Sequence, residues 1–161
     1  MKSPAARIAT PLLIALLVFV ADQLAKHWAS LSLVGTPQPN PSILGGWISL
    51  LYTANQGAAF GVMAGNDNIF VLVAAIVLFV MTLSALLFPS RHTATLCSLG
   101  LQMGGAAGNM VDRVRSGYVV DYVFIRPLPV FNIADLAIVS GACLMAWVWL
   151  GQDTPHRSDQ A

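Results

Sequence analysis

Long apolar runs, interrupted by short polar stretches, dominate the chain. Four windows are long enough to cross a bilayer, which takes about twenty apolar residues at a rise of about 1.5 Å each. They are residues 8–28, 69–88, 94–111 and 133–150. The pattern predicts an all-α membrane protein, a bundle of four transmembrane helices, with residues 1–161 forming one integral membrane domain.

The connection between the first two windows, residues 31–68, has a different character. Three prolines and a Gly-Gly pair, typical of turns, lie between residues 37 and 46. Residues 47–53 are then rich in β-branched and aromatic side chains, as strands are. We therefore expect a small β-rich segment between the first and second helices, resting on the membrane surface. Residues 152–161 are polar, and we expect a disordered tail there.

The first window resembles a signal peptide, because Lys2 and Arg7 precede its apolar run. No small-x-small cleavage site follows the run; Asp22, Gln23 and Lys26 come next instead. We interpret residues 8–28 as an uncleaved first span.

Glycines recur in the third window at a spacing of four residues, as Gly100, Gly104 and Gly108. This spacing puts them on one stripe of a helix, where small residues let a neighbouring helix approach closely.

Composition supports a membrane location. The 161 residues are 57% hydrophobic and 9% charged, and no Glu is present, whereas soluble domains are roughly 25% charged. The net charge of +1 argues against a nucleic-acid partner. Cys97 and Cys143 lie inside apolar runs, and we expect both to be free thiols.

The polar residues gather at the ends of the windows. Asp22 and Lys26 lie near the end of the first, Asn109 and Asp112 near the end of the third, and Asp135 at the start of the fourth. Because consecutive spans alternate in direction, these ends share one membrane face with residues 31–68. Ionisable residues beside apolar spans are costly and are therefore functional by default.

The orientation of that face follows from the basic residues. Lys and Arg are equally numerous on the two sides of the membrane. When Lys26 and Arg113 are set aside as site residues, the side that contains the N-terminus has the excess, which marks it as cytoplasmic. We then expect both termini in the cytoplasm and the polar face outside.

Asp121 and Asp135 are the best candidates for a catalytic pair. Two neighbouring carboxyl groups share one proton, so one can activate water while the other polarises an amide carbonyl. Two structural explanations stay open. Asp135 lies three residues after Asn132, as in a helix capping box, and Asp121 is compatible with a solvated loop charge.

The remaining polar residues have structural or supporting explanations. Asp22 and Lys26 are four residues apart and can pair on one helix face. Gly105, Asn109, Asp112 and Arg113 also share a face, which suits a structural network as well as substrate contact. Asp112, Asp121 and Asp135 could hold Mg²⁺. No phosphate-binding or His/Cys ligand motif accompanies them, so we expect no metal and no other cofactor.

Several motifs together resemble lipoprotein signal peptidase, the bacterial type II signal peptidase. They are Asp22, the Asn55-Gln56-Gly57-Ala58-Ala59-Phe60 run, the Gly104 to Arg113 run, the Val119-Val120-Asp121-Tyr122 run and the Phe131-Asn132-Ile133-Ala134-Asp135 run. They occur in the family's order over nearly the whole chain.

The resemblance implies an intramembrane aspartic peptidase of the bacterial inner membrane. Its substrates would be diacylglyceryl-modified prolipoproteins, cut just before the lipidated Cys, and we expect it to act as a monomer among membrane lipids. Asp121 and Asp135 match the family's catalytic dyad. The supporting or substrate-contacting positions match Asp22, Lys26, Asn55, Gly57, Gly105, Asn109, Asp112, Arg113, Asn132 and Ala134.

Two functions from other classes compete with this one. Carboxylates in spans also mark ion pathways, so a small cation-coupled carrier is one alternative. Two observations argue against a carrier. Its carboxylates would be expected near the bilayer midplane, whereas those of this chain lie near one face, and the sequence contains no repeated halves. A membrane scaffold without enzymatic activity is the other alternative.

Overall fold

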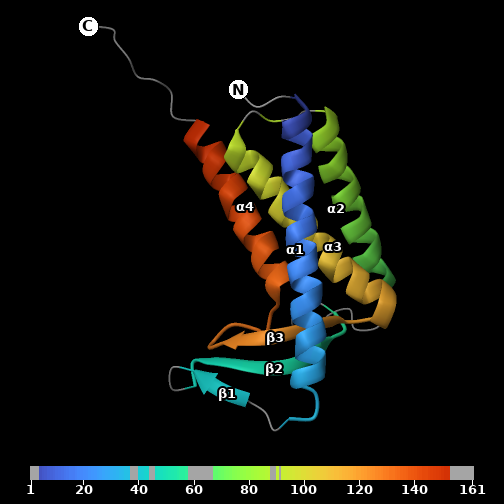
Figure 1. Cartoon of the computed structure of the whole chain (residues 1–161), viewed down its shortest axis with the longest axis vertical. Helices are drawn as coiled ribbons and strands as arrows, with labels where there is room; N and C mark the ends of the chain where they lie inside the picture. The colour runs from blue at the N-terminus through green and yellow to red at the C-terminus, as the bar shows by residue number, and fades with distance from the viewer. Residues whose placement is uncertain are drawn as a thin grey trace, which may run out of the picture.

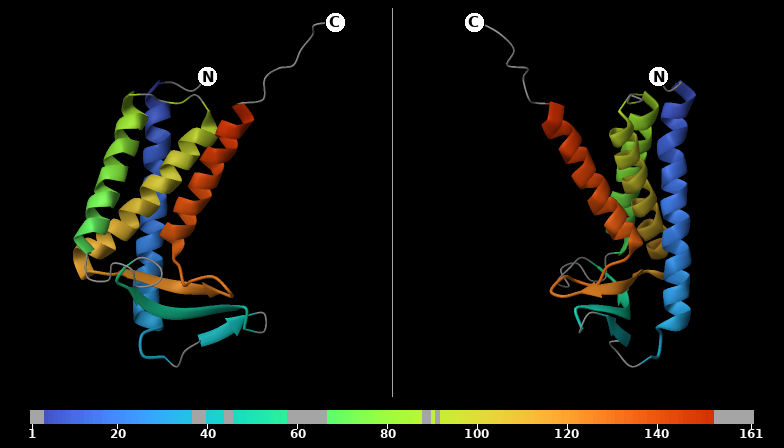
Figure 2. Two further views of the ribbon diagram at one scale, coloured as in Figure 1. Left: turned by 180° about the vertical axis from the view of Figure 1, so that it is seen from behind. Right: turned by 60° about the vertical axis from the view of Figure 1, so that its left-hand side comes forward.

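The computed structural model describes residues 4–36, 40–43, 46–57, 67–87, 90 and 92–152. Within them lie four helices and three strands. In chain order they are α1 (Pro4–Ser32), β1 (Asn40–Ile43), β2 (Ile48–Asn55), α2 (Asp67–Leu87), α3 (Thr93–Ser116), β3 (Val119–Ile125) and α4 (Ile133–Gln152). The helices form a bundle, and the sheet lies across one end of it (Figure 1). The start of α1 and the end of α4 lie at the opposite end, as the further views also show (Figure 2).

Helix α3 is the centre of the bundle. It packs against α1, α2 and α4, whereas the described residues of α2 and α4 do not contact each other. Its glycines permit this, as the sequence predicts. A Cβ on Gly104 would lie 2.6 Å from the Ala15 carbonyl oxygen of α1, and a Cβ on Gly105 would overlap the Ala134 carbonyl oxygen of α4. Two neighbouring helices therefore approach α3 at van der Waals distance.

The bundle has apolar side chains outside and polar ones inside. Leu17, Phe79 and Val139 are each about 60% exposed, whereas Asp22 and Asn132 are fully buried. This distribution is the reverse of that in a soluble domain. It suits a helical surface surrounded by lipid.

Three described helical segments are long and apolar enough to cross a membrane: Ala5–Ser32, Ile69–Leu87 and Ile133–Gly151. Helix α3 does not meet this criterion of length and composition. It also runs past the predicted end of the third window, residue 111, to Ser116. The additional turn carries Asp112, which is buried and paired, and Arg113 and Arg115, which suit a helix carboxyl end. Gly117, with φ of 76°, then ends the helix in the left-handed conformation.

The sheet is only partly as expected. Strands β1 and β2 confirm the β-rich segment between α1 and α2, but the sheet has a third strand, β3, in order β1-β2-β3. The protein is therefore mostly helical rather than all-α, and Asp121 is a buried strand residue, which excludes the alternative of a solvated loop charge. Alternating β-branched and aromatic residues in Val119–Ile125 explain the strand. The predicted tail, apart from Gln152 itself, lies outside the described residues.

Candidate active site

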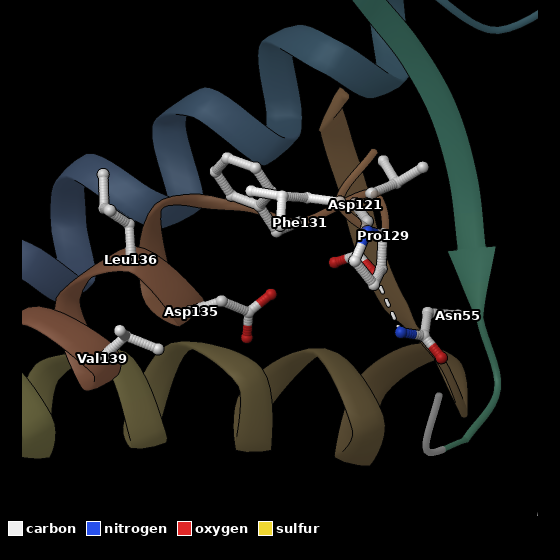
Figure 3. Close-up of a pocket in the computed structure, with 9 residues that line it drawn as sticks. Asn55, Asp121, Pro129, Phe131, Asp135, Leu136 and Val139 are labelled. Carbon is white, nitrogen blue, oxygen red and sulfur yellow. Dashed lines mark hydrogen bonds between the residues drawn. The ribbon is translucent and has the colours of Figure 1, made fainter. Parts of the chain in front are cut away.

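Asp121 and Asp135 line one cavity of about 410 Å³ at the sheet end of the bundle. Asp121 lies on β3 and Asp135 in the first turn of α4. Figure 3 shows the Asp135 carboxylate pointing toward the side of the cavity on which Asp121 and Asn55 lie. The remaining wall is apolar and is formed by Leu128, Pro129, Val130, Phe131, Leu136 and Val139.

A reversal of the chain after β3 brings the two aspartates together. Phe131 pairs with Val123 in an antiparallel bridge, with backbone hydrogen bonds of 2.9 Å in both directions. The bridge lays the start of α4 beside β3. Residues 14 apart in sequence thereby share a site.

Strand β2 contributes a side chain to Asp121. Thr53 is opposite Asp121 in the antiparallel register, so Asn55 is its diagonal neighbour. The Asn55 side-chain amide donates to Asp121 Oδ2 at 2.9 Å (Figure 3). Asn55 Oδ1 also accepts from the backbone N–H of Gly57 at 3.1 Å. Gly57 thus holds Asn55, and the following residues, 58–60, lie outside the described part of the chain.

Asn132 joins the two aspartates. Its side-chain amide donates to Asp121 Oδ1 at 2.7 Å, and its Oδ1 accepts from the backbone N–H of Asp135 at 2.9 Å. Asp135 Oδ2 accepts in return from the backbone N–H of Asn132 at 3.3 Å. These reciprocal bonds form the capping box that the spacing predicts. Asp135 therefore caps α4 and also lines the cavity.

A buried ion cluster lies beside the site and is formed by Asp22 and Lys26 of α1 with Asn109 and Asp112 of α3. Lys26 Nζ lies 2.8 Å from Asp22 and 2.8 Å from Asp112, and it donates to Asn109 Oδ1 at 2.8 Å. Asn109 then donates to Asp135 Oδ1 at 2.7 Å. The predicted pairing of Asp22 with Lys26 is present, and the cluster extends through Asn109 to one carboxylate of the candidate dyad.

Asp22 also reaches the start of α4. Its Oδ1 accepts from the backbone N–H of Ala134 at 3.0 Å, a donor that has no partner within α4. Gly108 permits this contact, because a Cβ there would lie 2.5 Å from Asp22 Oδ2. Ala134 thus contacts the ion cluster through its backbone N–H and not through its side chain.

Arg113 lies apart from the two aspartates. Its guanidinium stacks over the Phe70 ring of α2 at 5.1 Å, and it lines a different cavity between α2, α3 and α4. Gln23, in contrast, belongs to the cluster although the sequence analysis did not select it. It donates to Asp112 Oδ1 at 2.9 Å. Its position three residues before Lys26, on the same helix face, is the signal that could have identified it.

Burial sets the proton affinity of Asp121. It raises the pKa of the Asp121 carboxyl to about 6, and the neighbouring Asp135 carboxylate adds to the increase. Hydrogen bonds from Asn55 and Asn132 oppose the shift. Asp121 therefore holds a proton at higher pH than an ordinary aspartate does.

The described residues contain no group of three His, Cys or acidic side chains placed to hold a metal. Asp112, considered with Asp121 and Asp135 as a magnesium ligand, instead directs its oxygens to Lys26, Gln23 and the backbone N–H of Val120.

Comparisons with known proteins agree with this arrangement. Residues 14–150 match the model of the signal peptidase (SPase) II family. A lipoprotein signal peptidase of Moorella thermoacetica is 41% identical over 138 residues, 84% of this chain and 89% of its own. One from Caldicellulosiruptor bescii is 38% identical over 82% of this chain and 85% of its own.

A solved structure of a bacterial membrane enzyme superimposes with a TM-score of 0.81 at 24% identity. It covers 95% of this chain and 94% of its own, which shows a shared fold. With its apolar helices, this chain is a membrane protein. The family match and the identity to curated relatives, both over most of the chain, establish that it belongs to the signal peptidase II family of proteases.

Proposed function

We propose that this chain is an aspartic endopeptidase that removes the signal peptide from diacylglyceryl-modified prolipoproteins, cutting just before the lipidated Cys. One observation carries the proposal. Asp121 and Asp135 line the same partly apolar cavity, and burial raises the pKa of the Asp121 carboxyl to about 6. Asp121, Asp135, Asn55 and Asn132 all come from one chain, which supports a monomeric enzyme.

The two carboxyl groups divide the chemistry between them. Asp135 accepts hydrogen bonds from the Asn109 side chain and the Asn132 backbone, which fix its carboxylate toward the cavity, and it is assigned the role of base. Asp121, with its raised pKa, holds the shared proton. Asp135 then removes a proton from water as the water attacks the scissile carbonyl, and Asp121 protonates the carbonyl oxygen.

Collapse of the resulting gem-diol breaks the C–N bond. The proton that Asp135 accepted passes to the leaving nitrogen, which becomes the free amine of the lipidated Cys. Asp121 recovers its proton from the gem-diol as the new carboxyl group forms. No metal is needed for any of these steps.

The shape of the site suits a substrate that arrives from the membrane. Leu136 and Val139 extend the cavity wall along the lipid-exposed surface of α4, and both are more than half exposed. A second cavity of about 230 Å³ lies between α2, α3 and α4. Its lining is mostly apolar and also includes Gln102, Asn109 and Arg113. We assign the diacylglyceryl chains to the first cavity and the apolar part of the signal peptide to the second. Anchored in this way, the scissile bond is held at a fixed depth before chemistry.

We further propose four membrane crossings in the bacterial inner membrane, with both termini cytoplasmic and the sheet outside. Helix α3 has 24 residues, and at a rise of about 1.5 Å each it spans about 36 Å, more than the hydrocarbon core of about 30 Å. Its polar residues Asn109 and Asp112 are satisfied by Lys26 inside the bundle rather than exposed to lipid.

Substitution of each aspartate tests the proposal. With a purified diacylglyceryl prolipoprotein as substrate, Asp121→Asn and Asp135→Asn should each reduce cleavage by at least about 10²-fold, the usual minimum for a lost acid or base. The solvent-exposed Arg126→Gln is the matched control and should cleave normally. Turnover near that of the control in either aspartate variant would remove that residue from the mechanism. An unlipidated substrate should be cut far more slowly than the lipidated one.

A further inference from the structure

A cavity of about 460 Å³ lies outside the site described above and shares no lining residue with it. It is formed by the second half of α1 and the last turn of α3, with Val120 of β3 at its edge. Neither the proposed mechanism nor the proposed substrate path uses it.

The lining changes from apolar to polar along α1. Phe19, Val20 and Leu24 come first, and Lys26, His27 and Ser30 follow. From Phe19 to Ser30 the helix rises about 16 Å, roughly the distance from the bilayer midplane to the headgroups of one leaflet. Trp28, next to His27, is 47% exposed, as expected for an aromatic ring at the membrane–water interface. The polar half of the cavity therefore lies at headgroup level.

Cationic and hydroxyl groups line this polar half. Arg115 and Ser116 of α3 and His27 of α1 are all exposed there. Within the described residues Arg115 has no carboxylate within 4.0 Å, since the ion pairs found there are those of Lys26. Asp112 also lines the cavity. Its Oδ1 accepts from Gln23, and its Oδ2 accepts from Lys26 and the Val120 backbone.

We propose that this cavity binds one phospholipid with an anionic headgroup. Its phosphodiester would lie between Arg115 and His27, and an acyl chain would follow Phe19, Val20 and Leu24. An arginine guanidinium binds phosphate through paired hydrogen bonds, and an acyl chain fits the apolar half. A headgroup without a cation is favoured, because the choline cation of a zwitterionic lipid would be repelled by Arg115. The proposal does not depend on the peptidase chemistry, because none of these five residues lines the cavity that contains Asp121 and Asp135.

Quenching of Trp28 fluorescence tests the proposal. Replacement of Trp47, Trp147 and Trp149 by Phe leaves Trp28 as the reporter. The protein is placed in phosphatidylcholine vesicles containing either dibrominated phosphatidylglycerol or dibrominated phosphatidylcholine at equal mole fraction. Brominated phosphatidylglycerol should quench Trp28 more strongly. Arg115→Gln should weaken this preference roughly fivefold, the effect of one basic residue near an anionic surface.

Two controls distinguish specific binding at Arg115 from nonspecific attraction of anionic lipid to any exposed basic residue. Arg126, an exposed arginine just after β3, provides the matched variant Arg126→Gln, which should keep the preference. Equal quenching by the two lipids, or equal effects of the two arginine variants, would overturn the proposal. Arg115 also offsets the carboxyl end of α3. If that were its only role, Arg115→Gln would lower the melting temperature and leave the lipid preference unchanged, which would equally overturn it.

A competition experiment distinguishes binding of a lipid from binding of a soluble phosphate. Excess glycerol phosphate in the buffer should leave the preference intact, because it lacks the acyl chain that Phe19 and Val20 contact. Displacement by glycerol phosphate would overturn the assignment to a lipid. Cleavage activity is not measured, so failure of the dyad hypothesis would not affect the result.

Discussion

Asn109 on α3 donates its side-chain amide to Asp135 Oδ1 at 2.7 Å. The orientation of that amide is fixed, because its oxygen accepts from Lys26 at 2.8 Å and from Asn132 at 3.2 Å. A lysine on α1 thus determines which end of the Asn109 amide faces Asp135.

Replacement of Asn109 by Asp should therefore impair cleavage. The new carboxylate still satisfies Lys26 and Asn132, but it removes the donor to Asp135 Oδ1 and places a second negative charge against the proposed base, so the two carboxylates repel each other. We expect a loss of about 10²-fold or more in kcat, with little change in melting temperature. Asn109→Ala, which removes the donor without adding charge, should lose less. An Asn109→Asp enzyme as active as the wild type would show that the contact does not tune Asp135.

Close packing at Gly105 gives a stability prediction. A Cβ there would overlap the Ala134 carbonyl oxygen, so Gly105→Ala should destabilise the protein by about 1–3 kcal/mol, as over-packing does. Gly151→Ala is the matched control, because nothing lies within 4 Å of its added Cβ. Helix propensity favours alanine there by roughly 0.5–1 kcal/mol. Thermal unfolding in detergent measures both, and equal melting temperatures for the two variants would contradict the proposed contact.

The raised pKa of Asp121 predicts how stability depends on pH. In the unfolded chain this carboxyl ionises near 3.8, and in the folded protein near 6. Between these values the folded state binds more protons, so Asp121 should reduce stability as pH rises from about 4 to 6, by up to about 3 kcal/mol in all. Asp121→Asn should remove this component. Melting temperatures of both proteins at pH 5 and pH 8 test it, and parallel pH profiles would contradict it.

The same pKa predicts the alkaline limit of activity. If Asp121 donates the proton, kcat/KM should fall as pH rises through about 6, because the free enzyme loses its acid. The Arg126→Gln control should show the same profile. A kcat/KM that rises with pH through this range would assign the proton to the other carboxyl.

The sequence pattern predicted the four helices and the β-rich segment, because period, window length and turn residues are local signals. It also placed Asp121 and Asp135 at the same end of the bundle, where they line one cavity, and their catalytic role stays a prediction. It missed β3. The search was for apolar windows long enough to cross a membrane, and the seven residues of Val119–Ile125, which include the charged Asp121, are too few and too polar to form one. The contact of Asp22 with the Ala134 backbone could not be predicted. It joins residues 112 apart in sequence, and the side chain alone does not reveal which backbone group it will meet.

The proposed orientation can be tested by cysteine labelling of intact cells. In a background without Cys97 and Cys143, Gln56→Cys at the sheet end should react with a membrane-impermeant reagent. His92→Cys, at the other end of the bundle, should not react. Both residues are exposed in the structure. Labelling of position 92 alone would invert the topology.

Catalysis should persist in excess EDTA after dialysis, because the proposed chemistry uses only carboxyl groups and water. Cleavage rates before and after treatment measure this. Activity that is lost and then restored by Mg²⁺ or Zn²⁺ would replace the aspartic mechanism with a metal-dependent one.

The ion pair between Lys26 and Asp22 has a consequence for biosynthesis. It joins residues four apart on one helix, so it forms as soon as α1 does, well before the ribosome has made Asp112 or Ala134. The nascent first helix can thus enter the bilayer with its two charges already compensating each other, which lowers the cost of inserting them. When α3 and α4 follow, the same two groups keep their ion pair and add contacts to Asp112 and to the Ala134 backbone, which hold three helices together. A pair that first eases insertion later serves as the attachment point for the rest of the chain.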